Sequence, residues 1–146
     1  MRPAALGLLS FLFVLEVDLL SKVVATRQLD VLYNDANHGD LRRRVALSLL
    51  AVLAVYGFAR IAQWRGFGKL RGAWLCVGVL VGGITGNGLS HLIWPHGTPD
   101  FIEAGDYVWN VADFAIGLGL AGCAFSIAGS ALVAYARGRF GTGPGV

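Results

Sequence analysis

The segment from Gly82 to Asp113 decides the fold, and it reads GGITGNGLSHLIWPHGTPDFIEAGDYVWNVAD. It begins inside an apolar stretch, leaves that stretch at Trp94-Pro95, and enters a second apolar stretch around Tyr107. Polar side chains are costly inside a membrane, so those at such positions are candidates for a functional site. The segment therefore predicts two membrane spans joined by a connection that carries function.

The composition of the whole chain agrees with a membrane protein. Hydrophobic residues make up 55% of the 146 residues and charged residues only 14%, whereas a typical soluble domain is about 25% charged. We predict an all-α membrane protein that forms a single integral membrane domain over residues 1–146. Its four transmembrane helices are expected at about 3–25, 45–63, 72–94 and 107–135, each long enough to cross a bilayer.

The segment 26–44 is expected to form a small extracytoplasmic element. Alternation of Leu29, Val31 and Tyr33 suggests a short β-strand there, and the Asn, Asp and Gly residues that follow are typical of turns. Placing both termini in the cytoplasm puts seven Lys and Arg residues on the inner side and four on the outer side, with Lys22 left out of the count. This excess favours that orientation, and it explains the net charge of +3 better than nucleic-acid binding does.

Two carboxylates, Asp100 and Asp113, flank the entry into the fourth predicted span. Burial raises a carboxyl pKa, and a second carboxylate nearby raises it further. Two such acids can share one proton, as in the aspartic proteases, where one activates water and the other polarises the carbonyl. The spacing makes such a pair possible without fixing the separation. A proton- or ion-conducting role for the intramembrane polar groups is the rival interpretation.

Other polar residues give weaker signals. Asp18 and Lys22 lie four residues apart and share a helix face, either as a pair snorkelling at the membrane surface or as part of a site. The two cysteines lie within apolar stretches and have no metal-ligand spacing, so we expect packing roles. The three histidines are too scattered to predict a metal site, and no serine lies in a nucleophile motif.

Taken together, these residues give the chain a family resemblance. It resembles the lipoprotein signal peptidases (type II signal peptidases), which are four-span aspartyl proteases of the bacterial plasma membrane. The similar motifs are D-x-x-x-K, N-x-G, GGxxGN, V-D-F and N-x-A-D, in that order along the chain. They correspond here to Asp18–Lys22, to Tyr33–Ala36 with Ala36 in place of the glycine, and to Gly82–Asn87, Pro99–Ile102 and Asn110–Asp113.

The resemblance implies a function and a set of site residues. The substrate would be a prolipoprotein whose cysteine carries diacylglycerol, cut just before that cysteine so that the signal peptide is released. Asp100 and Asp113 would be catalytic. The residues expected to bind substrate or support the site are Asn87, Asn110, Asp18, Lys22, Asn34 and Gly86. The resemblance implies no metal or organic cofactor, no nucleic-acid partner, and a monomer with its active site near the outer face.

The chain also departs from the family pattern. The family's GNxxDR motif ends in an acid and an arginine, whereas Ser90 and His91 stand in those places here. Only twelve residues separate Asp100 from Asp113, fewer than the family leads us to expect. We expect the loss of the Asp-Arg pair to loosen the outer end of the third span. An inactive family member, or a non-enzymatic four-helix module such as a small transporter or assembly factor, is therefore the alternative.

Overall fold

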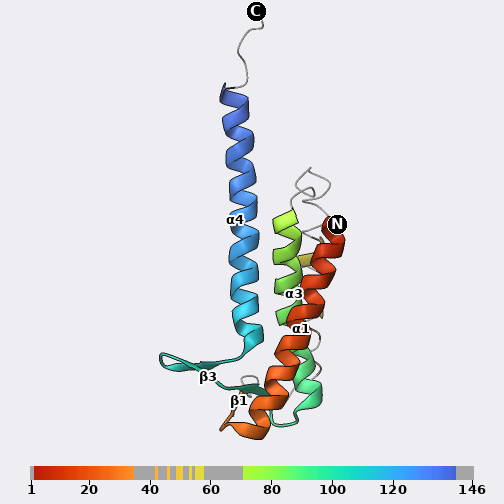
Figure 1. Ribbon diagram of the computed structural model, residues 1–146, viewed down its shortest axis with the longest axis vertical. Coiled ribbons are helices and arrows are strands. Elements are labelled where there is room, and N and C mark those ends of the chain that lie inside the picture. The colour runs from red at the N-terminus through yellow and green to blue at the C-terminus, as the bar shows by residue number, and fades with distance from the viewer. Residues whose placement is uncertain are drawn as a thin grey trace, which may run out of the picture.

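The computed structural model describes residues 2–34 and 71–140, together with isolated positions between 42 and 57. In this part of the chain, three helices carry four short strands at one end (Figure 1). The helices are α1 (Pro3–Gln28), α3 (Arg71–Ile93) and α4 (Val111–Phe140). The strands are β1 (Leu32–Asn34), β2 (Thr98–Asp100), β3 (Ile102–Ala104) and β4 (Tyr107–Trp109).

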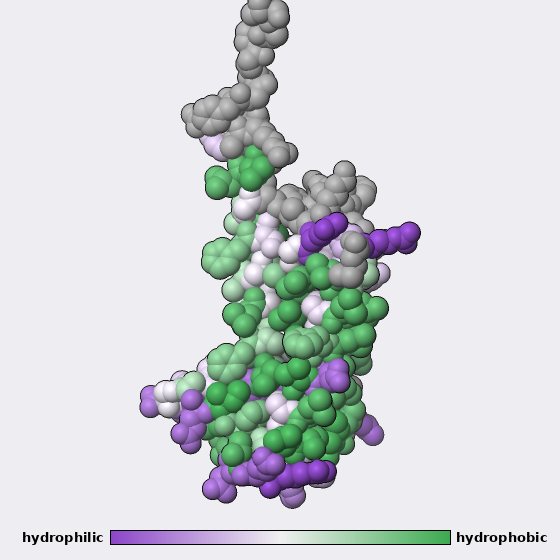
Figure 2. Space-filling model, in the orientation of Figure 1, coloured by the Kyte–Doolittle hydropathy of each residue, from purple (hydrophilic) through white to green (hydrophobic). Residues whose placement is uncertain are grey.

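The described helices agree with three of the four predicted spans. Each contains a window long and apolar enough to cross a membrane: Pro3–Gln28, Arg71–Ile93 and Val111–Gly129. Apolar side chains cover the middle of these helices on the face in Figure 2, and hydrophilic ones lie toward both ends, including the end that carries the strands. The second predicted span, 45–63, lies outside the described residues apart from isolated positions, so the count of four stays a prediction.

The start of the fourth predicted span was placed too early. Residues Tyr107–Trp109 form strand β4, and helix α4 begins only at Val111. β4 pairs with β3 in an antiparallel hairpin whose turn contains Gly105 at a φ of 64°. Glycine adopts such a positive φ without steric cost, so the hairpin closes before the helix starts. The apolar residues of β4 therefore belong to the hairpin.

The first strand pair joins two segments that are far apart in the sequence. β1 runs antiparallel to β2, with Leu32 opposite Asp100 and Asn34 opposite Thr98. β1 confirms the short strand expected near Tyr33, while residues 35–41 of that predicted element lie outside the described part. The pairing holds the end of α1 beside the segment that carries Asp100.

Helix α3 lies between α1 and α4 and contacts both (Figure 1). Small residues make these contacts close. A Cβ atom on Gly82 would lie 2.9 Å from the Cβ of Val14 in α1, and one on Gly83 would lie 2.6 Å from the backbone oxygen of Ala112 in α4. Glycines allow helix backbones to approach in this way within a membrane. This close packing of the helices lets polar side chains of α1, α3 and α4 meet near the end of the bundle that carries the strands.

Candidate active site

Asp18 and Lys22 form an ion pair inside the helix bundle. Lys22 Nζ lies 2.8 Å from Asp18 Oδ2, and both side chains are completely buried. Buried charges need a partner and further hydrogen bonds, because water no longer solvates them. The pairing predicted from their spacing is confirmed, and the burial excludes a pair snorkelling at the surface.

The Lys22 ammonium also donates to two side chains of α3. Its nitrogen lies 2.9 Å from Asn87 Oδ1 and 2.9 Å from Ser90 Oγ. An ammonium group has three donors and no acceptor, so Asp18, Asn87 and Ser90 satisfy it completely. Lys22 therefore ties α1 to α3.

Asp18 ties α1 to the beginning of α4. Its Oδ1 accepts a hydrogen bond of 2.8 Å from the backbone N–H of Ala112. The first N–H groups of a helix have no partner within the helix, and the helix dipole favours negative charge there. Asp18 therefore serves as an anionic cap for α4. Gly86 leaves room for this carboxylate, because a Cβ atom at that position would overlap Asp18 Oδ2.

Asn110 and Asp113 define the first turn of α4 by reciprocal hydrogen bonds. The backbone N–H of Asp113 donates to Asn110 Oδ1 at 3.2 Å, and the backbone N–H of Asn110 donates to Asp113 Oδ2 at 3.0 Å. This is the arrangement of a capping box, with an acidic side chain three residues after the capping one. The Asn-x-x-Asp sequence thus fixes where the Asp113 carboxyl points.

Asp100 reaches the same place from strand β2. Asn110 Nδ2 donates to its Oδ1, and Asn34 Nδ2 donates to its Oδ2 at 3.1 Å. Asp100 is only 1% exposed, and burial raises the pKa of its carboxyl, with a further raising contribution from the charge of Asp113. The hydrogen bonds from the two amides oppose part of that rise.

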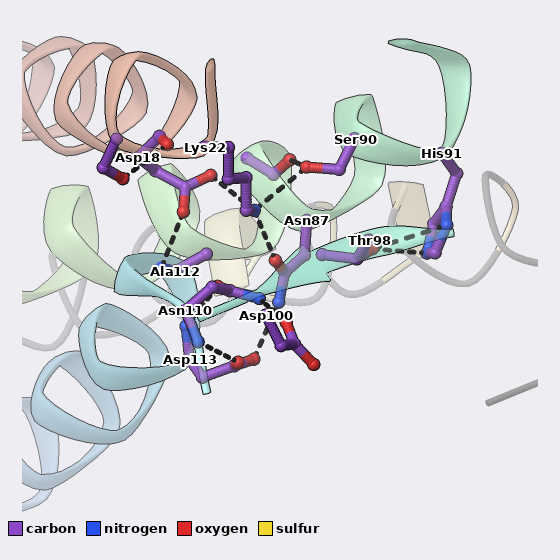
Figure 3. Close-up of polar contacts among 12 residues, drawn as sticks. Asp18, Lys22, Asn87, Ser90, His91, Thr98, Asp100, Asn110, Ala112 and Asp113 are labelled. Atoms are coloured by element: carbon purple, nitrogen blue, oxygen red, sulfur yellow. Dashed lines mark hydrogen bonds and ion pairs between the residues drawn. The ribbon is translucent and has the colours of Figure 1, made fainter. Parts of the chain in front are cut away.

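One asparagine therefore joins the two aspartates. Asn110 donates from its amide to Asp100 and binds Asp113 through its backbone N–H and its side-chain oxygen. Asn87 adds a second donor to Asp113, with 2.8 Å between Asn87 Nδ2 and Asp113 Oδ1. Figure 3 shows these residues meeting where α1, α3, β2 and α4 come together.

The structure brings all the residues expected at the site into one hydrogen-bonded cluster. Gly86 contributes space and its backbone oxygen, and the others contribute polar side chains. Among the described residues, no group of three His, Cys, Asp or Glu side chains is arranged to hold a metal ion. The cluster contains two carboxyl groups, those of Asp100 and Asp113, which accept hydrogen bonds from side-chain amides, and the Asp100 carboxyl is buried.

Ser90 is the residue whose position the sequence did not reveal. The family resemblance marks it as a loss, yet it is completely buried, accepts from Lys22 and donates to the backbone oxygen of Gly86 at 2.7 Å. The expected loosening of α3 at this point is therefore not seen at Ser90. Its spacing of three residues from Asn87 places both on one helix face and is the only local signal.

His91, the second departure, has a different environment. Its ring nitrogens lie 3.4 Å and 3.5 Å from the hydroxyl oxygen of Thr98, the first residue of β2. His96 packs edge to face against Tyr33 of β1. The two histidines thus contact the paired strands β1 and β2, and no sequence motif pointed to these contacts.

Comparison with known proteins gives the same assignment. The chain matches the family model of signal peptidase (SPase) II over residues 10–128. No curated protein matches it. Its fold is similar to two solved structures of bacterial membrane enzymes obtained by the in meso method, at 1.9 Å and 2.3 Å resolution.

The fold agreement extends over most of each chain. The 1.9 Å structure is 17% identical, with a TM-score of 0.65 over 83% of this chain and 91% of the other. The 2.3 Å structure is 16% identical, with a TM-score of 0.60 over 96% and 93%. The family match covers well over half of the sequence and agrees with the apolar helices. This chain is therefore a membrane protein of the signal peptidase II family.

Proposed function

We propose that the protein is a membrane aspartyl endopeptidase that removes signal peptides from diacylglyceryl-modified prolipoproteins. The observation that carries the proposal is the joining of Asp100 and Asp113 through Asn110 in a chain of the signal peptidase II family. An aspartyl protease needs two carboxyls that differ in protonation. Burial of Asp100 favours its neutral form, so we assign the shared proton to Asp100 and the role of the base to Asp113.

The proposed reaction uses the pair in two steps. Asp113 takes a proton from water while Asp100 donates its proton to the carbonyl oxygen of the scissile peptide, giving a tetrahedral intermediate. When the intermediate collapses, Asp113 gives its proton to the leaving amine and Asp100 recovers one from the intermediate's hydroxyl. The protons balance, and the water is incorporated into the released signal peptide. No metal or organic cofactor takes part.

The remaining cluster residues would support this pair. Asn87 and Asn110 orient the aspartates and the substrate, and Asn34 holds Asp100 from strand β1. Asp18 and Lys22 join the three helices behind them, and Gly86 leaves the space for Asp18. These roles are supported by the hydrogen bonds that each residue makes.

The positions of the strands and of the charged residues support a proposed location for the protein. The protein would be a multi-pass protein of the bacterial plasma membrane, with both termini cytoplasmic and the active site near the outer face. Asn34 of β1 and Asp100 of β2 belong to the cluster, and these strands lie at one end of the helices (Figure 1), where an extracytoplasmic element was expected. The substrate and the membrane lipid are the proposed partners, and the enzyme would act as a monomer.

Cleavage of a lipid-modified preprolipoprotein by the purified protein tests the proposal. We expect a shortened product from the parent chain, and a loss of at least about 100-fold in Asp100→Asn and in Asp113→Asn. Asp106→Asn is the matched control, because Asp106 is an exposed acid of the same connection. It should cleave normally.

Two outcomes would contradict different parts of the proposal. Full activity in either aspartate variant would remove that residue from the catalytic pair. No product from a folded parent chain would instead favour an inactive family member or a non-enzymatic membrane module.

A further inference from the structure

We propose that Ser90 is a positioning residue for catalysis: through Lys22, it fixes the orientation in which the Asn87 amide donates to Asp113. The inference rests on the proposed function, since it assigns Asp113 a catalytic role. It goes beyond that function by giving a task to a residue at which this chain departs from the family pattern.

The first step is the direction of the Ser90 hydroxyl. Its single proton is used on the backbone oxygen of Gly86, 2.7 Å away. A hydroxyl that has donated its proton can only accept from its other neighbours. Ser90 Oγ therefore presents a lone pair to Lys22 Nζ at 2.9 Å.

The second step is the fixed position of the Lys22 ammonium. Its three donors point to three acceptors, Asp18, Asn87 and Ser90, and the side chain is completely buried. With every donor in use and the side chain buried, rotation of the ammonium would break hydrogen bonds made by a charged group. Removing the Ser90 oxygen leaves one donor without its partner and frees the ammonium to reorient.

The third step is the choice between two orientations of the Asn87 amide. As found, its oxygen faces Lys22 and its nitrogen faces Asp113 Oδ1 at 2.8 Å. In the flipped orientation, the amide nitrogen would face an ammonium and the amide oxygen would face a carboxyl oxygen. Donor would meet donor and acceptor would meet acceptor, so the placement of Lys22 selects the orientation that gives Asp113 a hydrogen bond.

The three steps form one connected chain of hydrogen bonds, in which Lys22 is the donor toward both ends. The hydrogen-bond directions from the Gly86 carbonyl through Ser90, Lys22 and Asn87 are all determined, and the chain ends on an oxygen of Asp113. A side chain at position 90 without an acceptor would break this chain at its origin. Asp113 would then keep only the backbone donor of Asn110 in a fixed place.

Ser90→Ala tests the inference in the purified, full-length protein. We expect the variant to fold, to bind the lipidated preprolipoprotein with an unchanged KM, and to lose roughly tenfold in kcat, because only the orientation of a catalytic group is impaired. Ser10→Ala is the matched control. The Ser10 hydroxyl also lies between α1 and α3, with its oxygen 3.1 Å from Leu75 O and within hydrogen-bond distance of Leu6 O and Gly7 O in its own helix. Ser10 lies outside the cluster, so Ser10→Ala should keep the parent kcat.

A double-mutant cycle separates positioning from general packing. If Ser90 acts through Asn87, Ser90→Ala should have no further effect on kcat once Asn87→Ala is present. Thermal unfolding in detergent checks that each variant is folded. Should Ser90→Ala fail to fold, Ser90→Cys replaces it, since sulfur is only a weak acceptor of similar size.

The outcomes distinguish this inference from the proposed function. The positioning role would be overturned if Ser90→Ala left kcat unchanged. It would also be overturned if the kcat of the double variant fell by the product of the two single-variant losses. The protease assignment would stand in both cases. A fall in kcat that Ser10→Ala reproduces would also overturn the positioning role, since packing between α1 and α3 would explain both. No cleavage by the folded parent chain would overturn the proposed function, and this inference with it.

Discussion

Lys22→Met is the substitution for which the structure makes the sharpest prediction of stability. It replaces a buried ammonium with an apolar side chain of similar length. Among the described residues, it leaves the buried charge of Asp18 with one donor, the N–H of Ala112. Breaking a buried ion pair by removing one partner costs about 3–5 kcal/mol. The oxygens of Asn87 and Ser90 also lose their donor, so we expect the upper half of that range.

A second substitution tests the reason for the loss. Asp18→Asn in the Lys22→Met background removes the unpaired negative charge and keeps a side-chain oxygen that can accept the hydrogen bond from the N–H of Ala112. We expect it to recover about 2 kcal/mol of the free energy of unfolding. Arg27→Met is the control, because Arg27 is an exposed cation in the last turn of the same helix. A cation at that place contributes only about 0.3–1 kcal/mol.

Reversible unfolding in mixed micelles, followed by the fluorescence of the four tryptophans, measures these differences. If the free energy of unfolding of Lys22→Met lies within about 1 kcal/mol of the parent value, the buried ion pair does not stabilise the fold as its burial indicates. If the double variant is no more stable than the single one, an uncompensated charge is not the cause of the loss.

Two further predictions concern space and pH. Gly86→Ala should cost about 2 kcal/mol and reduce cleavage, because the new methyl group would overlap Asp18 Oδ2; Gly117→Ala, with nothing within 4 Å of its Cβ, should be neutral in the same unfolding and cleavage assays. Because the pKa of Asp100 is raised, the folded protein holds the proton of this carboxyl more tightly than the unfolded chain does. The stability that this proton contributes is fully present below the ordinary pKa of 3.8, and it is lost as the pH rises through the raised pKa. Free energies of unfolding measured between about pH 4 and pH 7 should fall with pH, and Asp100→Asn should flatten that slope; an identical slope in the variant would refute the assignment.

The parts of the fold that the sequence predicted are those set by local chemistry. The bounds of α1 and α3 follow from apolar length and from Pro95, since the residue before a proline avoids helical backbone angles. The pairing of Asp18 with Lys22 follows from the helical repeat alone. Their complete burial does not, because it depends on how closely α3 and α4 approach.

The parts that were missed depend on partners distant in the sequence or on a turn. By comparison with the family motif, Ser90 stands where an acidic residue was expected. Its role depends on a hydrogen bond from the Lys22 ammonium, which is 68 residues away in the sequence. Strand β4 was assigned to a helix because its residues are apolar, and both strands and helices use apolar residues in short runs. The Ala-Gly-Asp sequence at 104–106 was the turn signal that could have shown the hairpin.

The pairing of Asp18 and Lys22 within one helix also bears on how the chain is assembled. α1 is made first, and it carries both charges into the bilayer before α3 and α4 exist. Because the two residues share a helix face, they can neutralise each other on α1 alone and lower the cost of its insertion. The N–H of Ala112 then reaches Asp18 only when the last described helix arrives. The proposed catalytic cluster therefore cannot be complete before α4 has been made and has packed against α1, so we expect a chain that ends before α4 to have no cleavage activity.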